Sequence, residues 1–245
     1  LQHASGRRAA NALASIVRNP GETELKKEAL EALAGLGGAE VGGQIVEIIR
    51  RAKDPEIQAM AMGSLARVMG SRAIGTLAPS LQSADPSIKR IAVLTIARLS
   101  SPLALPGLLE MLVQPEGDNA AEIAFQDLTF QVSLNPSPPR RSQVYQAWFE
   151  SSGARDRAQW FLDAGRESLA EIDTSVDWLE ASTLAVADVR VLIVLLQKGN
   201  RPVRQAADAT LMRVLRLTLD PVGGTEVEGT DRAKYYERWI STGKR

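Results

Sequence analysis

A repeated pattern of apolar residues constrains the fold of this chain more than any other feature of its sequence. Within each copy, three apolar positions follow one another at spacings of four residues, and the copies are offset by 32 and 31 residues. The copies are Leu25, Ala29 and Leu33; Ile57, Ala61 and Leu65; Ile88, Ala92 and Ile96; and, later in the chain, Val203, Ala207 and Leu211. This spacing forms a stripe along one side of a helix and differs from the alternation of a strand. The sequence therefore predicts an all-α protein with a repeated helical unit.

The repeated unit is a helical hairpin, because a second amphipathic segment precedes each of these helices. The preceding segments are 6–18, 40–53, 71–83, 103–114 and 186–198. At two junctions Asp54 and Asp85 stand before a proline, where an aspartate caps the free N–H groups of a helix and proline needs no donor. Hairpins of this size cannot bury their apolar faces alone and must stack. We therefore expect an α-α superhelix, that is, a solenoid.

The sequence resembles the HEAT-repeat family at the start of the second helix of each hairpin. The resemblance lies in Asp54-Pro55-Glu56-Ile57-Gln58, in Asp85-Pro86-Ser87-Ile88-Lys89 and in the segment from Arg201 to Ala207, and it extends over residues 6–131 and 186–217. It implies a HEAT-like solenoid whose second helices line a concave face that binds a partner. Gln58 and Lys89 replace the arginine of the family pattern, so the expected ladder of Asp–Arg contacts is incomplete.

Aromatic residues mark two departures from the repeat, since none precedes Phe125 and none lies between Trp178 and Tyr235. Two segments share a Leu-Thr pair, a loop, an arginine, a tyrosine four residues later and a tryptophan three residues after that. They contain Tyr145 with Trp148, and Tyr236 with Trp239. Each pair lies on one face of a helix, which predicts two aromatic capping helices that cover an exposed repeat edge. A ligand-binding aromatic cluster is the alternative.

These features divide the chain into three regions of one continuous solenoid. Residues 1–131 hold the N-terminal HEAT-like repeats. Residues 132–185 hold a Pro-rich loop, the first aromatic capping helix and an irregular helical insert. Residues 186–245 hold a further HEAT-like repeat and the second capping helix. The loop followed by a tryptophan helix is similar to the ending of some bacterial HEAT-repeat proteins.

Composition excludes several classes of function. The chain has no cysteine, one histidine near the N-terminus, and 29 basic against 29 acidic residues. Disulfides, thiolate metal sites and cysteine nucleophiles are therefore excluded, and no catalytic residue, cofactor or metal site is predicted. The balanced charge argues against a nucleic-acid partner. The longest apolar run is too short to cross a bilayer.

The start at Leu1 without a signal segment fits either a processed chain or a fragment. The compartment stays open between cytoplasm and periplasm or exterior, as does the oligomeric state.

The sequence therefore predicts a non-catalytic protein–protein interaction scaffold that binds a protein or peptide on its concave face. The predicted partner-binding residues are the basic residues of the second helices: Lys27, Arg67, Arg90, Arg98, Arg204 and Arg213. The alternative is a HEAT-like enzyme, similar to a DNA glycosylase or a chromophore lyase, that uses the aromatic segment from Phe125 to Trp178.

Overall fold

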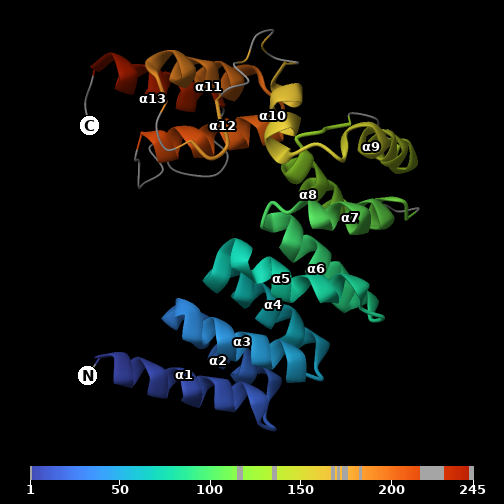
Figure 1. Ribbon diagram of the computed structural model, residues 1–245, viewed down its shortest axis with the longest axis vertical. Helices are drawn as coiled ribbons and strands as arrows, with labels where there is room; N and C mark the ends of the chain where they lie inside the picture. Colours follow the sequence, from blue (N-terminus) through green and yellow to red (C-terminus); the bar gives the residue numbers. More distant parts are fainter. Residues whose placement is uncertain are drawn as a thin grey trace. The chain divides into compact units, whose positions relative to one another are not determined.

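Helices are the only regular secondary structure in the part of the chain that the structure describes, and no strand occurs there (Figure 1). The computed structural model describes residues 2–114, 118–133, 137–166, 169, 172, 176–181, 184–215 and 229–242. The chain forms two compact units, which we call unit 1 (Leu1–Ala124) and unit 2 (Phe125–Arg245). Each unit is described by itself below.

Unit 1 begins with two regular hairpins. The first consists of α1 (Gln2–Arg18) and α2 (Thr23–Leu36), and the second of α3 (Gly38–Arg51) and α4 (Pro55–Met69). Helix α1 packs against α3, and α2 packs against α4, so the hairpins stack in two layers. Gly37, with a φ of 65°, makes the sharp connection between α2 and α3. Only glycine adopts this left-handed conformation without a steric cost.

The third hairpin differs from the sequence prediction in its first helix. The predicted helix 71–83 is divided into η1 (Gly70–Ala73), α5 (Ile74–Leu77) and η2 (Ala78–Gln82), while the second helix, α6 (Pro86–Arg98), is regular. Pro79 has no backbone N–H and cannot donate to the carbonyl of Gly75. The regular α-helical ladder is therefore interrupted there, although the apolar side chain of Leu77 remains buried. A further hairpin follows with η3 (Pro102–Ala104), α7 (Leu105–Leu112) and α8 (Asn119–Thr129).

The predicted apolar stripe forms the core of unit 1, with one exception. The predicted core positions of α4 and α6 are at most 5% exposed, as are Ala29 and Leu33 of α2. Leu25 is 50% exposed and lies outside the core. The predicted all-α fold of packed helical hairpins is confirmed.

Unit 2 contains the remaining helices and repeats the hairpin once. These helices are α9 (Pro138–Ser152), α10 (Arg157–Arg166), α11 (Val186–Lys198), α12 (Arg201–Val214) and α13 (Gly229–Thr242). Helices α11 and α12 form the predicted hairpin, α13 packs on α11, and α10 packs on α12. The last residues of α8, from Phe125 onward, belong to this unit.

In the first predicted capping segment, Tyr145 lies in the core of unit 2 and Trp148 is partly buried at its edge. The ring of Phe125 contacts those of Tyr145 and Trp148 at centroid distances of 4.7 and 5.7 Å. The Trp148 ring in turn lies 5.4 Å from that of Trp160. Tyr145 is 1% exposed, and its hydroxyl accepts hydrogen bonds from the side chain of Gln126 and the backbone N–H of Ser133. These rings fill space by contacting one another, which is the arrangement of a core.

The second predicted capping helix, α13, is attached to α12 through Asp208. The Tyr236 hydroxyl donates to one carboxylate oxygen of Asp208 at 2.7 Å, and Arg232 forms an ion pair with the other oxygen at 2.5 Å. Burial, followed by this hydrogen bond, raises the pKa of Tyr236, so the phenol stays protonated. The side chain of Trp239 lies outside the described residues, and the capping role of the four aromatic residues stays a prediction.

The boundary between the two units falls inside α8, at residues 124 and 125. The predicted region boundaries at residues 131 and 185 stay predictions. Much of the predicted irregular insert, between residues 167 and 183, lies outside the described residues.

Candidate functional site: a basic pocket in unit 1

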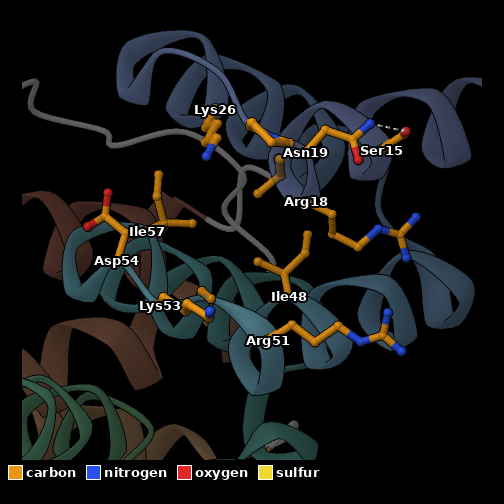
Figure 2. A pocket seen from close by; sticks show the side chains of 12 residues that line it. Ser15, Arg18, Asn19, Lys26, Ile48, Arg51, Lys53, Asp54 and Ile57 are labelled. Atoms are coloured by element: carbon orange, nitrogen blue, oxygen red, sulfur yellow. Dashed lines mark hydrogen bonds between the residues drawn. The ribbon is translucent and has the colours of Figure 1, made fainter.

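A surface cavity of about 720 Å³ lies between the first two hairpins of unit 1 (Figure 2). Two turns line it, the one that joins α1 to α2 and the one that joins α3 to α4. We call it the rim pocket. Its lining residues are Ser15, Val17, Arg18, Asn19, Pro20, Lys26, Ile48, Arg51, Ala52, Lys53, Asp54 and Ile57. Its volume lies in the range of about 300–1,000 Å³ that is usual for ligand pockets.

The rim pocket has an apolar floor and a polar, open mouth. Val17, Ile48 and Ile57 are at most 5% exposed and belong to the core beneath the pocket. Asn19 lies at the mouth, and its side-chain amide donates to the hydroxyl of Ser15 at 3.2 Å. Ligands can therefore find apolar contact and hydrogen-bonding groups at the same place.

Four basic residues and one acidic residue line the rim pocket. The acidic residue, Asp54, is already in use, because its Oδ1 accepts the backbone N–H of Glu56 at 2.9 Å and so caps α4. Arg18 donates to the carbonyl of Ala14, and Arg51 pairs with Glu47 on its own helix. Figure 2 shows both guanidinium groups on the same side of the pocket.

Lys26 and Lys53 are the two lining cations with no ion pair or side-chain hydrogen bond to any described residue. In Figure 2 the Lys26 ammonium points from α2 toward the space of the pocket, and Lys53 lies on the opposite wall. Lys26 is partly buried and Lys53 is exposed. Their positive charge is therefore uncompensated within the described part of unit 1.

Lys26 differs from the residues at the equivalent position of the next two hairpins. Lys26 follows Leu25 as Gln58 follows Ile57 and Lys89 follows Ile88. In the second hairpin Gln58 donates to the carbonyl of Ile49, and in the third Lys89 pairs with Glu110 at 2.6 Å. The first hairpin keeps a cation at this position, and its described residues supply no such partner.

Two of the predicted partner-binding residues, Lys27 and Arg90, form ion pairs within unit 1. Lys27 contacts Glu24 at 2.8 Å and Glu56 at 2.5 Å. Hydrogen bonds to Glu24 and then Glu56 raise the pKa of the Lys27 ammonium. Arg90 forms two hydrogen bonds with Asp118. Lys27 and Arg90 therefore stabilise unit 1 through ion pairs that were not predicted from the sequence.

Asp118 connects α6 to the start of α8. Burial alone would raise its pKa, but hydrogen bonds from Arg90 and from the backbone N–H of Ala121 outweigh that effect and lower the pKa. Its Oδ1 also accepts the N–H of Ala120. The carboxylate is thus ionised while it holds the two helices together.

Arg213, in unit 2, holds a segment of its own chain. Its Nε donates to the carbonyl of Ala181 at 2.9 Å, and its Nη2 donates to the carbonyl of Leu179. The neighbouring Thr210 hydroxyl donates to the carbonyl of Trp178 at 2.9 Å. Helix α12 therefore anchors the segment 178–181.

The other three predicted residues, Arg67, Arg98 and Arg204, are exposed and form no ion pair or side-chain hydrogen bond with described residues. They do not line the rim pocket. Partner binding by the six predicted residues stays a prediction. Lys26 and Lys53 were not predicted as site residues, because they meet only when two hairpins stack. The available signal was a cation at the repeat position that Gln58 occupies next.

The described residues contain neither a membrane-spanning helix nor a cluster of metal ligands. No helix among them is long and apolar enough to cross a membrane. In the same residues, no three His, Cys, Asp or Glu side chains gather as a metal site requires.

The fold and the pocket together define a protein of stacked helical hairpins with a ligand-sized basic cavity at one rim. Residues 43–128 match the family model for HEAT repeats, and the predicted resemblance to the HEAT-repeat family is confirmed for this part of the chain. No curated protein matches the sequence.

One similar solved structure is that of human deoxyhypusine hydroxylase in complex with glycerol. The alignment covers 99% of this chain and 99% of the hydroxylase, with 15% sequence identity and a TM-score of 0.44. A likeness at this level assigns no substrate or reaction to the present chain.

The prediction of a non-catalytic scaffold that binds a partner on its concave face needs correction. It rested on the lack of a nucleophile or acid–base group beside suitable partners in the sequence and on the wide binding surfaces of solenoids, whereas the similar solved structure is that of a hydroxylase. Fold does not determine function. The function must be argued from the pocket.

Proposed function

We propose that unit 1 recognises a short segment of a partner protein, and that this segment occupies the rim pocket. The observation that carries the proposal is the combination of a ligand-sized cavity with an apolar floor and hydrogen-bonding groups at its mouth. A peptide segment uses both, since its side chains need apolar contact and its backbone needs hydrogen-bonding partners.

The location of the rim pocket also supports a peptide. Five lining residues are exposed, so the pocket opens broadly at the surface: Arg18, Asn19, Pro20, Arg51 and Lys53. An extended segment can enter such a site without a lid or a rearrangement of the helices. Recognition by rigid stacked repeats also costs little ordering of the receptor.

The test is a selection of random peptides displayed on phage against the full chain, followed by a variant that blocks the pocket. Asn19→Trp introduces a bulky side chain at the exposed mouth without changing the charge. Ser71→Trp is the matched control, because Ser71 is exposed in unit 1 and does not line the pocket. Circular dichroism serves to check that both variants fold like the wild type.

We expect selected peptides to bind the wild type and Ser71→Trp equally and to lose about tenfold or more in affinity for Asn19→Trp, a cost of about 1.4 kcal/mol. Amide hydrogen exchange should slow at residues 15–20 and 51–58 when a peptide is bound. Selection of no peptide, or of peptides that bind Asn19→Trp with undiminished affinity, would overturn the proposal.

A further inference from the structure

We infer that the rim pocket selects acidic segments, with carboxylates of the bound peptide engaged by the ammonium groups of Lys26 and Lys53. This inference rests on the proposed function and names the chemistry of the partner. The carboxylates of the peptide would lie beside these two ammonium groups, where no acidic side chain of the described residues forms an ion pair with them.

The first argument is the charge balance of the pocket. Four cations face one carboxylate, and that carboxylate already caps a helix. Arg18 and Arg51 have acceptors on their own helices, whereas Lys26 and Lys53 have none among the described residues. A neutral or basic segment would leave these charges uncompensated, while an acidic one would pair with them.

The second argument is that helix stability does not explain Lys26. Arg18 and Arg51 stand in the last turns of α1 and α3, where a cation is favoured by the helix dipole. Lys53 directly follows the C-terminal capping residue of α3, so the same dipole favours its charge. Lys26, by contrast, is the fourth residue of α2, and a cation near a helix N-terminus is disfavoured by the dipole. The charge of Lys26 therefore does not stabilise its own helix, whereas it can pair with a bound anion.

The third argument is that the basic character belongs to this pocket and is not a property of the repeat. At the next turn Gln82 and Ala84 take the places of Arg51 and Lys53, since Asp85 follows them as Asp54 does here. The stacked hairpins thus carry a basic rim at the first two turns and a neutral one at the third.

The composition of unit 1 favours an acidic peptide over a nucleic acid. Unit 1 contains no aromatic residue on which a base could stack. The floor of Val17, Ile48 and Ile57 offers apolar contact that a phosphate cannot use. A segment in which acidic residues flank an apolar side chain fits both the walls and the floor.

The experiment compares two fluorescein-labelled peptides of equal length, one of alternating glutamate and leucine and one of alternating glutamine and leucine. Their affinities for the full chain are measured by fluorescence anisotropy. The pocket variant is Lys26→Glu with Lys53→Glu. The matched control is Arg8→Glu with Arg72→Glu, which makes the same change of charge at exposed residues of unit 1 that neither line the pocket nor belong to the predicted partner-binding residues.

We expect the glutamate peptide to bind the wild type about tenfold or more tightly than the glutamine peptide. The pocket variant should remove this preference and the control variant should keep it. Added salt should weaken the glutamate peptide more than the glutamine peptide, because ions screen exposed charges.

The outcomes separate the inference from the proposed function. Equal binding of both peptides, blocked by Asn19→Trp, would overturn the acidic preference and leave peptide recognition standing. A loss of preference in the control variant as well would also overturn the inference, because the effect would then be one of net charge. Inorganic tripolyphosphate that binds as tightly as the glutamate peptide would show a small-anion site instead. Failure of both peptides and of every phage-selected peptide would overturn both proposals.

Discussion

Arg213 shows how an exposed cation at a repeat position is used by the fold. Its guanidinium donates to two backbone carbonyls of the segment 178–181, and Thr210 on the same helix donates to a third. Trp178, within this segment, is 2% exposed. The segment has turns but no regular helix of its own. Its position in unit 2 therefore depends on side-chain donors from α12.

Replacing Arg213 with alanine should loosen this segment. Each lost hydrogen bond contributes about 0.5–1.5 kcal/mol, so amide exchange at residues 178–181 should accelerate while α11 stays protected. Hydrogen exchange followed by mass spectrometry measures this. Arg204→Ala is the matched control, because Arg204 is exposed on the same helix and has no described partner. Equal acceleration in both variants would contradict the anchoring role.

The repeat pattern predicts where a residue stands, but it does not predict what it contacts. It places Arg67, Arg98 and Arg213 at equivalent positions, two residues after a buried apolar residue. The first two are exposed without a described partner, whereas Arg213 contacts an irregular segment about 30 residues earlier in the chain. Lys26 and Lys53 were missed for the same reason, since their shared pocket depends on how two turns meet in space.

At the scale of single helices, local signals in the sequence were sufficient to predict where α6 begins. Asp85 precedes α6, and its Oδ1 accepts the N–H groups of Ser87 and Ile88 at 2.8 and 3.4 Å. Both partners lie within three residues, so the Asp-Pro pair determines the start of the helix without help from the rest of the fold. Glu22 holds the same position before α2 and makes no capping hydrogen bond.

Removal of the Asp85 cap should destabilise unit 1, whereas the same change at Glu22 should not. Asp85→Ala leaves the first N–H groups of α6 without a side-chain acceptor, at a cost of about 0.5–2 kcal/mol. Glu22→Ala removes no cap and should change the free energy of unfolding by less than about 0.5 kcal/mol. Urea unfolding followed by circular dichroism gives both values. An equal loss of stability in the two variants would show that the Asp85 hydrogen bonds contribute nothing.

Two other features were harder to predict than a helix start: whether a helix continues without a break, and which residues two similar helices contact. Period alone predicted one helix over 71–83, but Pro79 interrupts it. The two aromatic helices were predicted as copies of one module, yet the Tyr145 hydroxyl accepts bonds from Gln126 and Ser133, while the Tyr236 hydroxyl donates to Asp208. Similar sequences on α9 and α13 thus find different hydrogen-bonding partners, because the residues opposite them differ.

For the whole molecule, composition conceals the local excess of basic residues on which the inferred preference for acidic peptides depends. Residues 1–124 contain 13 basic and 13 acidic residues, and this balance argued against a nucleic-acid partner. The basic and acidic residues balance when they are summed over the whole segment, but they do not balance on each part of its surface. An ion pair such as Arg90 with Asp118 compensates one basic and one acidic residue within the fold. In the rim pocket, Lys26 and Lys53 have no such acidic partner among the described residues.

The distribution of tryptophan allows the two units to be observed separately. All four tryptophans lie in unit 2, at positions 148, 160, 178 and 239. Tryptophan emission therefore reports on unit 2, whereas far-ultraviolet circular dichroism reports on the helices of both. In repeat proteins each hairpin contacts only its neighbours, so destabilisation of one hairpin acts locally. A core substitution in one unit should therefore shift the unfolding transition of that unit and leave the transition of the other unit in place.

Leu65 and Leu211 provide a matched pair for this test, because they hold equivalent repeat positions and are both fully buried, in α4 and α12. Leu65→Ala should cost about 2–5 kcal/mol, lower the denaturant midpoint of part of the dichroism signal and leave the tryptophan transition in place. Leu211→Ala should shift the tryptophan transition. If Leu65→Ala instead shifted both signals together, the chain would unfold as one cooperative body, and a partner bound at the rim pocket would then stabilise all of it.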